Sequence, residues 1–386
     1  MMHAMRMAFI TAHYQPATVA CGVGDYTRCL RRALEGLGHS CSVLTSASSR
    51  SQEKDVYRVS GEWGARDLLA AWRILRAVNP EVMLLQYTPE HYGYGLVFKL
   101  LPALVRLRQR DTVVVTTFHT LVGGRWIAKV SAVLLAAQSH GVVSAHAELS
   151  ELYRRRLPWW ARKLHEIPIG ANIPAPLLER KLARQGLRRR LGVASETVIL
   201  GTFGFPSPGK GLETLLQAVR LLNESSAVYL ACVGETRAED RPYRAALESL
   251  ARRLKIDARV HWLGGLPEED VADLLLGADA YVVPYDDGAS LRRGTLMAGF
   301  RIGVPIMTTQ PRYPDPALQP GETILAVPPR SPEALAQCIA QLLADPQLQD
   351  RLRKGMAAAG SRFDWEAIAR QYVKFITHLR TQPMPV

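Results

Sequence analysis

The sequence predicts an α/β protein built from two doubly wound, Rossmann-like domains that face each other across a cleft. Short apolar runs of strand length alternate with longer segments of helical periodicity, and this alternation stops at a Pro-rich stretch and then starts again. In addition, the 386 residues of the chain exceed what one hydrophobic core usually serves. We therefore expect two domains of the same general kind.

Apolar runs and segments of 3.6-residue spacing define the elements of the first half. The expected strands are Met7–Thr11, Ser42–Thr45, Val82–Gln86, Val113–Phe118 and Gly141–Ser144. The expected helices are Asp25–Leu37, Ala65–Val78 and Arg125–Ala137. These strands do not alternate apolar with polar residues, which is typical of a parallel sheet covered by helices on both faces.

The segment from His165 to Pro176 is rich in Pro and predicts a linker, after which the pattern restarts. The expected strands are then Val198–Gly204, Val228–Val233, Arg259–Leu263, Ala280–Val283 and Pro305–Thr309. The expected helices are Leu212–Leu222, Tyr243–Leu254, Glu268–Gly277, Pro332–Ala344 and Trp365–Leu379. We expect an N-terminal domain over 1–170, a C-terminal domain over 171–363, and a helix over 364–386 that crosses back to the N-terminal domain.

Composition excludes several classes of protein. No apolar run reaches the roughly 18 residues that indicate a membrane span, and the first apolar run leads to Tyr14 without a cleavage signal. The five cysteines form no CxxC pair and no metal-ligand spacing, which favours a reducing compartment. We therefore expect a cytoplasmic protein without a bound metal ion or cofactor.

The net charge of +13 is concentrated in one region. Residues 151–190 hold eleven Arg and Lys against three Asp and Glu, which favours an anionic partner. Within it, residues 154–163 place Trp159 and Trp160 among five cations, a pattern that suits an anionic membrane surface at the inner face of the membrane. The alternative is a solvated helix end whose Trp side chains pack inward.

The stretch Gly201-Thr-Phe-Gly-Phe-Pro-Ser-Pro-Gly-Lys-Gly211 carries the strongest functional signal. It is an apolar strand that breaks into a Gly/Pro loop, ends in Lys210-Gly211, and precedes an amphipathic helix. Such a loop directs backbone N–H groups and one ammonium toward a single spot, which suits a phosphate oxygen. We therefore expect Lys210 to contact phosphate.

Two further features occur in the first half. Gly22 and Gly24 in Cys21-Gly-Val-Gly24 open a helix, either as a tight turn or as a close approach to a ligand. His119 follows the buried strand Val113–Phe118 at its carboxyl end, where open α/β sheets place their sites. A histidine bonded to the backbone for structural reasons is the alternative for His119.

The order of motifs along the chain resembles the retaining nucleotide-sugar glycosyltransferases of the GT-B fold, family four. The resemblance spans nearly the whole chain, and it lies in the order and spacing of many short motifs. They are Gly22-Val-Gly24, His119, Pro168-Ile-Gly-Ala-Asn172, Pro208-Gly-Lys-Gly211, Val233-Gly-Glu235, Leu263-Gly264, Val282-Val-Pro284, Gly303-Val-Pro305, Asp345-Pro346 and Phe363-Asp-Trp365.

The resemblance implies roles for particular residues. It places the donor diphosphate against the C-terminal domain, with Lys210 as counter-charge, and the acceptor toward the N-terminal domain. Catalytic roles are expected for His119, Lys210 and Arg293. The expected donor-binding residues are Gly22, Gly24, Phe205, Lys210, Glu235, Leu263, Gly264, Ser290, Arg292, Arg293, Gly294 and Thr295.

Two departures from the family pattern stand out. Phe205 occupies the place of the Arg that usually follows the strand before the Lys-Gly loop, and Ala298 and Ser290 occupy the places of two glutamates spaced eight apart. The nearby pair Arg292-Arg293 is expected to restore the lost positive charge, because a planar guanidinium can grip phosphate with two hydrogen bonds. A solvated basic pair is the alternative, as is a helix-capping role for Ser290 and Thr295.

Acceptor-side residues are expected in loops that follow strands of the first half. Tyr14, Gln86 and Tyr87 are the candidates, together with Tyr92 and Tyr94, because tyrosines often line sugar pockets. Surface tyrosines without a ligand are the alternative. The acceptor itself stays open, with lipid-linked sugars and polysaccharides among the candidates.

The function expected is transfer of a sugar from a nucleoside diphosphate sugar to an acceptor hydroxyl, with retention of configuration as the resemblance implies. Protein cations and helix dipoles would stabilise the leaving diphosphate, so no metal ion is expected. A nicotinamide dehydrogenase is disfavoured because Thr27 stands where a Gly-x-Gly-x-x-Gly motif needs its third glycine. A catalytically silent sugar-nucleotide-binding protein stays open, as does, less favoured, a basic nucleic-acid-binding protein.

Overall fold

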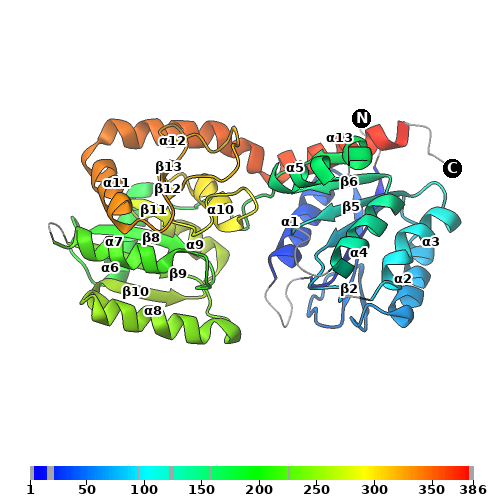
Figure 1. Ribbon diagram of the computed structural model, residues 1–386, viewed down its shortest axis with the longest axis horizontal. Helices are drawn as coiled ribbons and strands as arrows, with labels where there is room; N and C mark the ends of the chain where they lie inside the picture. Colours follow the sequence, from blue (N-terminus) through cyan, green and yellow to red (C-terminus); the bar gives the residue numbers. More distant parts are fainter. Residues whose placement is uncertain are drawn as a thin grey trace. The chain divides into compact units, whose positions relative to one another are not determined.

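The computed structural model describes residues 4–14, 21–93, 95–120, 126–145, 147–156, 158–224 and 227–381, without the side chains at positions 147–149, 156 and 159. The chain divides into two compact units, each an α/β structure of its own (Figure 1). Unit 1 consists of Met1–Gly170 together with Asp364–Val386, and unit 2 is Ala171–Phe363.

A seven-stranded parallel sheet forms the centre of unit 1, in the order β3-β2-β1-β4-β5-β6-β7. Its strands are β1 (Arg6–Thr11), β2 (Ser40–Ser46), β3 (Val56–Val59), β4 (Val82–Tyr87), β5 (Val113–Phe118), β6 (Gly141–Ser144) and β7 (Leu164–Glu166). The chain order reverses between β1 and β4, so the carboxyl ends of these strands form the topological switch point. The edge strand β7 occupies the start of the segment that was predicted as a linker.

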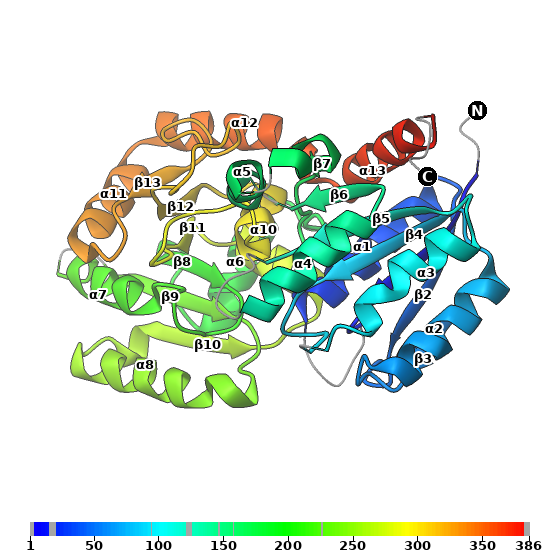
Figure 2. The same cartoon turned by 45° about the vertical axis from the view of Figure 1, so that its right-hand side comes forward.

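Helices cover both faces of this sheet, as the unbroken apolar strands predict. In β1, Met7 and Phe9 pack with α1 and α13, whereas Ala8 and Ile10 pack in the core beneath α2, α3 and α4. Figure 2 shows α3 and α4 lying over the strands. The helices are α1 (Gly22–Gly36), α2 (Ala65–Val78), η1 (Phe98–Leu100), α3 (Leu101–Arg108), α4 (Trp126–Gln138), α5 (Ala147–Arg156), η2 (Pro158–Lys163) and α13 (Trp365–Thr381).

The last helix of the chain, α13, is part of the core of unit 1. The hydroxyl of Tyr372 is hydrogen-bonded to the hydroxyl of Tyr26 in α1 at 2.8 Å and to that of Thr117 in β5 at 2.9 Å. One turn further on, the ring of Phe375 stacks on His165 of β7 with 4.7 Å between centroids. These contacts join α13 to a helix and two strands of unit 1.

A six-stranded parallel sheet forms the centre of unit 2, in the order β10-β9-β8-β11-β12-β13. Its strands are β8 (Val198–Phe203), β9 (Val228–Val233), β10 (Val260–Gly264), β11 (Ala280–Val283), β12 (Ile306–Thr309) and β13 (Leu325–Val327). Here the chain order reverses between β8 and β11. The carboxyl ends of these two strands are therefore where a doubly wound sheet binds its ligand.

Both faces of the second sheet are also covered. Leu200 and Val282 pack in one core with α7, α8 and α11, while on the other face Gly201 lies against Leu275 of α9. The helices are α6 (Arg180–Leu191), α7 (Leu212–Leu222), η3 (Ala238–Asp240), α8 (Arg241–Arg253), η4 (Asp257–Arg259), α9 (Glu268–Leu276), α10 (Gly294–Ile302), α11 (Pro332–Ala344), α12 (Pro346–Gly360) and η5 (Ser361–Phe363). In the described part of the chain, none of the helices has the length and apolarity needed to cross a membrane.

Candidate functional site

A pocket opens at the carboxyl ends of β8, β9 and β11 in unit 2, next to the switch point of the sheet. It has a volume of about 440 Å³, including open solvent at its mouth. Phe203–Pro206 and Lys210 line one side, Gly234 and Gly264 line the side of β9 and β10, and Tyr285 lines the side of β11. The Gly/Pro loop predicted to bind phosphate thus forms one wall of this pocket.

Glycine is required at Gly211 because the loops approach each other closely. Gly211 is the N-cap of α7 and has a φ of 68°, in the left-handed region that favours glycine. A Cβ at this position would overlap the carbonyl oxygen of Pro284, which follows β11. The backbone N–H of Asp286 also donates to the carbonyl of Gly209 at 3.2 Å. The Lys-Gly loop is therefore held directly against the chain that follows β11.

Lys210 lies half-buried in this wall, with its ammonium 6.0 Å from the centre of the Tyr285 ring. Burial, reinforced by the nearby cations Arg293 and Arg237, lowers the pKa of Lys210 to about 8. Within the described residues, no hydrogen bond or ion pair of the ammonium with a protein group is found. A desolvated cation beside two others is a strong attractor for an anion.

Arg293, the N-cap residue of α10, also lies beside the ring of Tyr285. Its guanidinium carbon lies 4.1 Å from the centre of the Tyr285 ring, and the Tyr285 hydroxyl is hydrogen-bonded to Thr295 Oγ1 at 2.6 Å. Arg293 also forms an ion pair with Asp287, and Arg292 forms a second one with the same carboxylate at 2.6 Å. Both predicted Arg side chains therefore pair with Asp287. Of the two, only Arg293 contributes to lowering the pKa of Lys210.

The remaining predictions at this turn have mixed outcomes. Ser290 Oγ accepts a long hydrogen bond of 3.4 Å from the backbone N–H of Arg292. Gly294 begins α10 and lies against Asn172, and no side chain caps this helix by a hydrogen bond. Asp286-Asp287-Gly288 forms a turn, and in the described part of the chain no group of three or more His, Cys, Asp or Glu is placed to hold a metal ion.

Arg237 is a site residue that the sequence analysis missed. Its guanidinium carbon lies 4.9 Å from the centre of the Phe205 ring, and its Nε donates to Asp240 at 2.6 Å. A cation therefore stands beside the position where Phe205 replaces the Arg of the family pattern. The available signal was a basic residue in the loop after β9, the strand next to β8.

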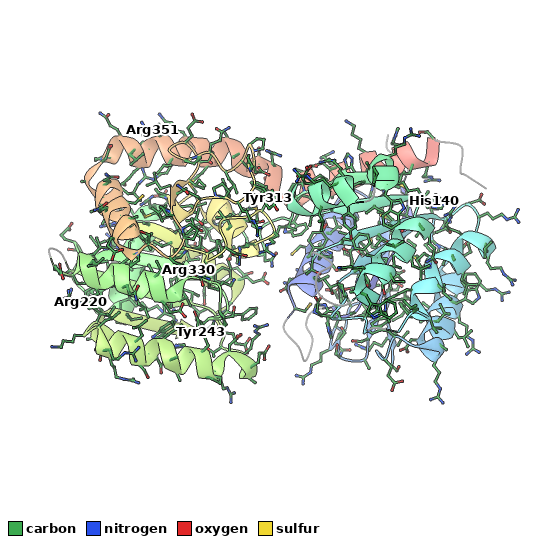
Figure 3. All side chains as sticks on the ribbon, viewed as in Figure 1. His140, Arg220, Tyr243, Tyr313, Arg330 and Arg351 are labelled. Atoms are coloured by element: carbon green, nitrogen blue, oxygen red, sulfur yellow. The ribbon has the colours of Figure 1, made fainter. Side chains whose placement is uncertain are left out.

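The far end of the pocket is aromatic and was also missed. Trp262 in β10 lies beneath Arg244 of α8, whose guanidinium carbon is 3.6 Å from the centre of a Trp262 ring. Of the residues predicted around it, Gly264 lines the pocket, Glu235 is exposed and lies against Gly265, and Leu263 is not among the lining residues. The wall formed by α7 and α8 is fixed by Tyr243, whose hydroxyl donates to Glu213 at 2.6 Å (Figure 3).

His119 lies at the carboxyl end of β5 in unit 1, as predicted. Its Nε2 is hydrogen-bonded to Gln86 Oε1 at 2.8 Å, and the edge of the Tyr26 ring packs against it with 4.6 Å between centroids. Gly22 and Gly24 form the first turn of α1 rather than a loop before it, because α1 begins three residues earlier than the predicted Asp25. A Cβ at Gly22 would meet open space.

The predicted loop positions of the acceptor-side residues are wrong for two of them. Gln86 and Tyr87 are the last residues of β4, and both are fully buried because β4 is a central strand covered on both faces. Tyr14 follows β1 but is buried as well, and its hydroxyl donates to Glu53 at 2.7 Å. Tyr92 is buried, and Tyr94 lies outside the described residues. Of the described tyrosines, Tyr14, Tyr87 and Tyr92 are therefore buried and do not line an open surface.

The predicted membrane segment, residues 154–163, also differs from expectation. Trp160 is only 8% exposed and packs in the core beneath α5, and the side chain of Trp159 lies outside the described residues. The inward packing weighed as the alternative is correct for Trp160, because this aromatic ring closes the apolar core at the end of the sheet.

Comparison with known proteins agrees with this geometry. Residues 184–358 match the family model described as glycosyl transferases group 1. D-inositol 3-phosphate glycosyltransferase of Corynebacterium urealyticum is 28% identical over 55% of this chain and 51% of that protein. Phosphatidyl-myo-inositol mannosyltransferase of Mycobacterium leprae is 27% identical over 69% of this chain and 68% of that protein. The chain spans about half the length of the first curated relatives that it matches.

The architecture matches solved structures over nearly the full chain. Anabaena HepE in complex with UDP and glucose has a TM-score of 0.75 and 17% identity, with 97% of this chain and 100% of that chain covered. A structural similarity of this extent, at such low sequence identity, establishes the fold alone. The predicted fold class is therefore confirmed. The chain thus has the GT-B fold, and residues 184–358, all within unit 2, are similar to the glycosyl transferases group 1 family.

Proposed function

We propose that this chain transfers a sugar from a nucleoside diphosphate sugar to an acceptor hydroxyl, with retention of the anomeric configuration. The observation that carries the proposal is the Lys210 ammonium, half-buried beside Arg237 and Arg293 and without a protein acceptor in the described part of the chain. Departure of a nucleoside diphosphate builds negative charge that must be met in place. The relatives and the HepE complex with UDP support a donor of this class.

In this proposal the diphosphate lies between Lys210, Arg293 and the N-terminus of α7. Gly211 carries no side chain that could cap α7, so the first N–H groups of the helix are available to an anion. Each well-placed donor to the developing charge contributes about 2.7–4 kcal/mol by analogy with an oxyanion hole. Protein cations and helix N–H groups therefore neutralise the leaving group in this proposal.

Arg237 supplies the cation that Phe205 lacks. The ring of Phe205 supports the guanidinium at 4.9 Å, Asp240 fixes it through Nε, and Nη1 forms an ion pair with Glu239 at 3.3 Å, so that Nη2 is the donor assigned to a phosphate oxygen. Arg292 is assigned a different task, since it shares Asp287 with Arg293 and helps to set the position of that carboxylate.

The nucleobase is assigned to the aromatic end of the pocket. Trp262 beneath Arg244 offers a flat apolar and cationic surface, and Gly264 lets a planar ring approach the backbone after β10. Glu235, at the exposed edge beside Gly265, is assigned to the nucleoside, and Ser290, Gly294 and Thr295 to the sugar side of the donor. Leu263 would contribute through its backbone.

His119 is assigned to the acceptor hydroxyl or the transferring sugar. Gln86 holds the His119 ring through Nε2 and the Tyr26 ring packs against it, so the orientation of the imidazole is fixed. The leaving phosphate itself takes the acceptor proton, so the bond to the acceptor oxygen forms as the bond to the diphosphate breaks. Gly22, exposed in the first turn of α1, provides backbone that a ligand can approach, whereas Gly24 is buried and is assigned to the tight packing of this turn.

The experiment that tests this proposal is a two-step screen on the full chain. Thermal unfolding is first followed with UDP, GDP and ADP, because a ligand that binds only the native state raises the melting temperature. The sugar nucleotides of the best base are then tested for hydrolysis and for transfer to lipid-linked and polysaccharide acceptors. Release of diphosphate with a glycosylated product supports the proposal.

The second candidate is a sugar-nucleotide-binding protein without turnover. It is favoured by Ala298 and Ser290, which stand where the family pattern has its two glutamates, and Ala298 is fully buried. Stabilisation by a nucleoside diphosphate without product from any donor and acceptor pair would select this candidate. Absence of stabilisation by all three nucleotides would overturn both.

A further inference from the structure

The outer surface of one helical layer of unit 1 is unusually apolar. Single exposed apolar side chains are normal, but a concentration of them marks an interaction site. Among the described residues, all large exposed apolar side chains of unit 1 lie on or at the start of α2, η1, α3 and α4. They are Leu69, Val97, Leu100, Leu107, Trp126, Val130 and Val133.

Helix α4 is apolar on both of its faces. Ala132 and Leu135 pack into the core, whereas Trp126, Val130 and Val133, spaced four and three residues apart, form one outer stripe. The exposed fractions of these three side chains are 71%, 39% and 42%. A surface helix of a globular protein normally carries polar residues there, so this stripe calls for a partner.

The other helices extend this surface without a break. The side chain of Gln138, at the end of α4, donates to the carbonyl of Lys99 at 3.1 Å and accepts from the backbone N–H of Ala103 at 2.9 Å. Helix α4 is thereby fixed to η1 and α3, and α3 in turn packs against α2. Figures 1 and 2 both show α2, α3 and α4 as neighbours. We call this surface the α2–α4 face.

The α2–α4 face is also strongly basic. Three Arg in α2, two Arg in α3 and one Lys in α4 stand against a single acid, Asp67, whereas Lys99 of η1 is buried and donates to the carbonyl of Gly93 at 2.9 Å, so it adds no surface charge. Asp67 is buried and accepts from Ser60 and from the backbone of Trp63, so it does not offset the surface charge. On α2, Arg66 and Arg73 are exposed on either side of Leu69.

Positive charge also gathers where α3 and α4 end. The guanidinium of Arg106 donates to the carbonyl of Gln138 at 3.3 Å, and Lys163 donates to the carbonyl of Ser139 at 3.0 Å. Burial, together with Arg106 and Lys163, lowers the pKa of His140 to about 4 (Figure 3). His140 is therefore neutral at physiological pH, and the charge at this end of the face is positive because of Arg106 and Lys163.

We propose that the α2–α4 face docks on the surface of an anionic lipid bilayer. Trp126 and the aliphatic side chains would enter the boundary between headgroups and acyl chains, while the surrounding Lys and Arg attract anionic headgroups. Charge complementarity favours this partner, because the face combines apolar area with cations and has no exposed acid on its helices. The contact differs from the one predicted for residues 154–163 and does not depend on the proposed sugar transfer.

The test is flotation of the full chain with phosphatidylcholine vesicles that contain or lack phosphatidylglycerol. The chain is expected to float with the anionic vesicles and to be released partly by high salt, because only the electrostatic part is screened. The substitutions Trp126→Ser, Val130→Ser and Val133→Ser together should lower the bound fraction about tenfold or more, since burial of apolar side chains drives insertion. Trp126→Phe alone should retain binding.

The matched control removes exposed apolar side chains from unit 2. Leu177→Ser, Leu178→Ser and Leu182→Ser together delete side chains that are 76%, 43% and 53% exposed and should leave flotation unchanged. Circular dichroism confirms that both triple variants fold. The proposal is overturned if the native chain does not float, if the α4 variant floats as well as the native chain, or if sedimentation shows that the face instead holds two copies together.

Discussion

The two units share a topology and differ in the chemistry at the carboxyl ends of their strands. In unit 2, Lys210, Arg237 and Arg293 gather next to the switch point, and the Lys210 ammonium has no protein acceptor in the described part of the chain. In unit 1, the corresponding end holds side chains that are hydrogen-bonded to one another, His119 to Gln86 and Tyr26 to Tyr372. Both sheets are parallel and covered on both faces.

The difference separates fold from function. A doubly wound sheet places a site at its switch point, but the side chains decide which ligand that site takes. Cations that are desolvated and held close together favour an anion, and among the described residues Lys210, Arg237 and Arg293 form such a group next to the switch point of unit 2. The hydrogen-bonded end of unit 1 is suited to orienting hydroxyl groups.

The largest expected effect is that of Lys210→Ala. Removing the half-buried ammonium should lower donor-dependent turnover by about a hundredfold or more, because the leaving diphosphate loses a fixed counter-charge. Steady-state kinetics with the donor found in the screen measure it. Turnover at the native rate would show that unit 2 does not hold the leaving group through Lys210, and the comparison between the units would fail.

His119→Asn tests the other unit. Turnover should fall by about ten- to a hundredfold, because misplacement of a reacting group lowers the rate by up to about a hundredfold. The affinity for the free nucleoside diphosphate should stay at the native value. Initial rates and a calorimetric titration give the two quantities. A weaker nucleoside diphosphate affinity in this variant would mean that the division of tasks between the units is wrong.

The neighbouring residues Phe205 and Arg237 allow an experiment in which the cation is moved from position 237 to position 205. Arg237→Ala should weaken nucleoside diphosphate binding about tenfold, in keeping with one charge-assisted hydrogen bond, and adding Phe205→Arg should restore much of the loss. Arg241→Ala, on α8 nearby, serves as the control for net charge.

A readout that needs no nucleotide accompanies this experiment. In Arg237→Ala the pKa of Lys210 should rise, because a nearby cation that lowers it has been removed. The pH dependence of chemical acylation of Lys210 measures this. An unchanged pKa would contradict the geometry even if no nucleotide binds, whereas a raised pKa without nucleotide binding would contradict only the proposed function.

The affinity for nucleoside diphosphate should also depend on pH through Lys210. Its pKa of about 8 in the free protein means that the ammonium is charged below pH 8 and loses its proton above it. A bound diphosphate holds the proton, so the affinity should fall by up to about tenfold per pH unit above pH 8. In Lys210→Arg the affinity should stay constant over this range. A flat profile for the native chain would contradict the prediction.

The smallest expected effect concerns the hydrogen bonds of unit 1. Tyr372→Phe removes the hydroxyl that joins Tyr26 to Thr117 and should lower the stability of unit 1 by about 1 kcal/mol. Native-state hydrogen exchange should detect this in β5 and α1 and leave the strands of unit 2 unaffected. An equal change in both units would show that they unfold together.

Much of the fold could be predicted from the sequence because the central strands are long, apolar and separated by clear helical periods. Strands β5, β6 and β11 begin and end at the predicted residues, and the family model of the glycosyl transferases group 1 matches residues 184–358. Helix α6 was missed because charge obscures its period. Its Arg188 is only 3% exposed and donates to Asp279 at 2.7 Å, so part of the basic surplus is structural.

The candidate site could be predicted only where it is local in sequence. Gly209, Lys210 and Gly211 follow one another in the sequence. They can be recognised because an apolar strand precedes their loop and an amphipathic helix follows it. Arg237, Arg244 and Trp262 lie in the loop after β9, in α8 and in β10, and they meet the Lys-Gly loop only through the order of the sheet. The burial of Gln86 and Tyr87 likewise depends on a tertiary neighbour, since helices close both faces of β4.

The place of α13 has a consequence for how the protein is made. Domains generally fold in the order in which the ribosome releases them, the first one first. Here the core of unit 1 includes Tyr372 and Phe375, which are synthesised after the whole of unit 2. Unit 1, whose sheet is synthesised before unit 2, can thus complete its core only after unit 2 has been synthesised. A nascent chain halted at residue 363 contains all of unit 2 but lacks the part of the core of unit 1 that α13 supplies.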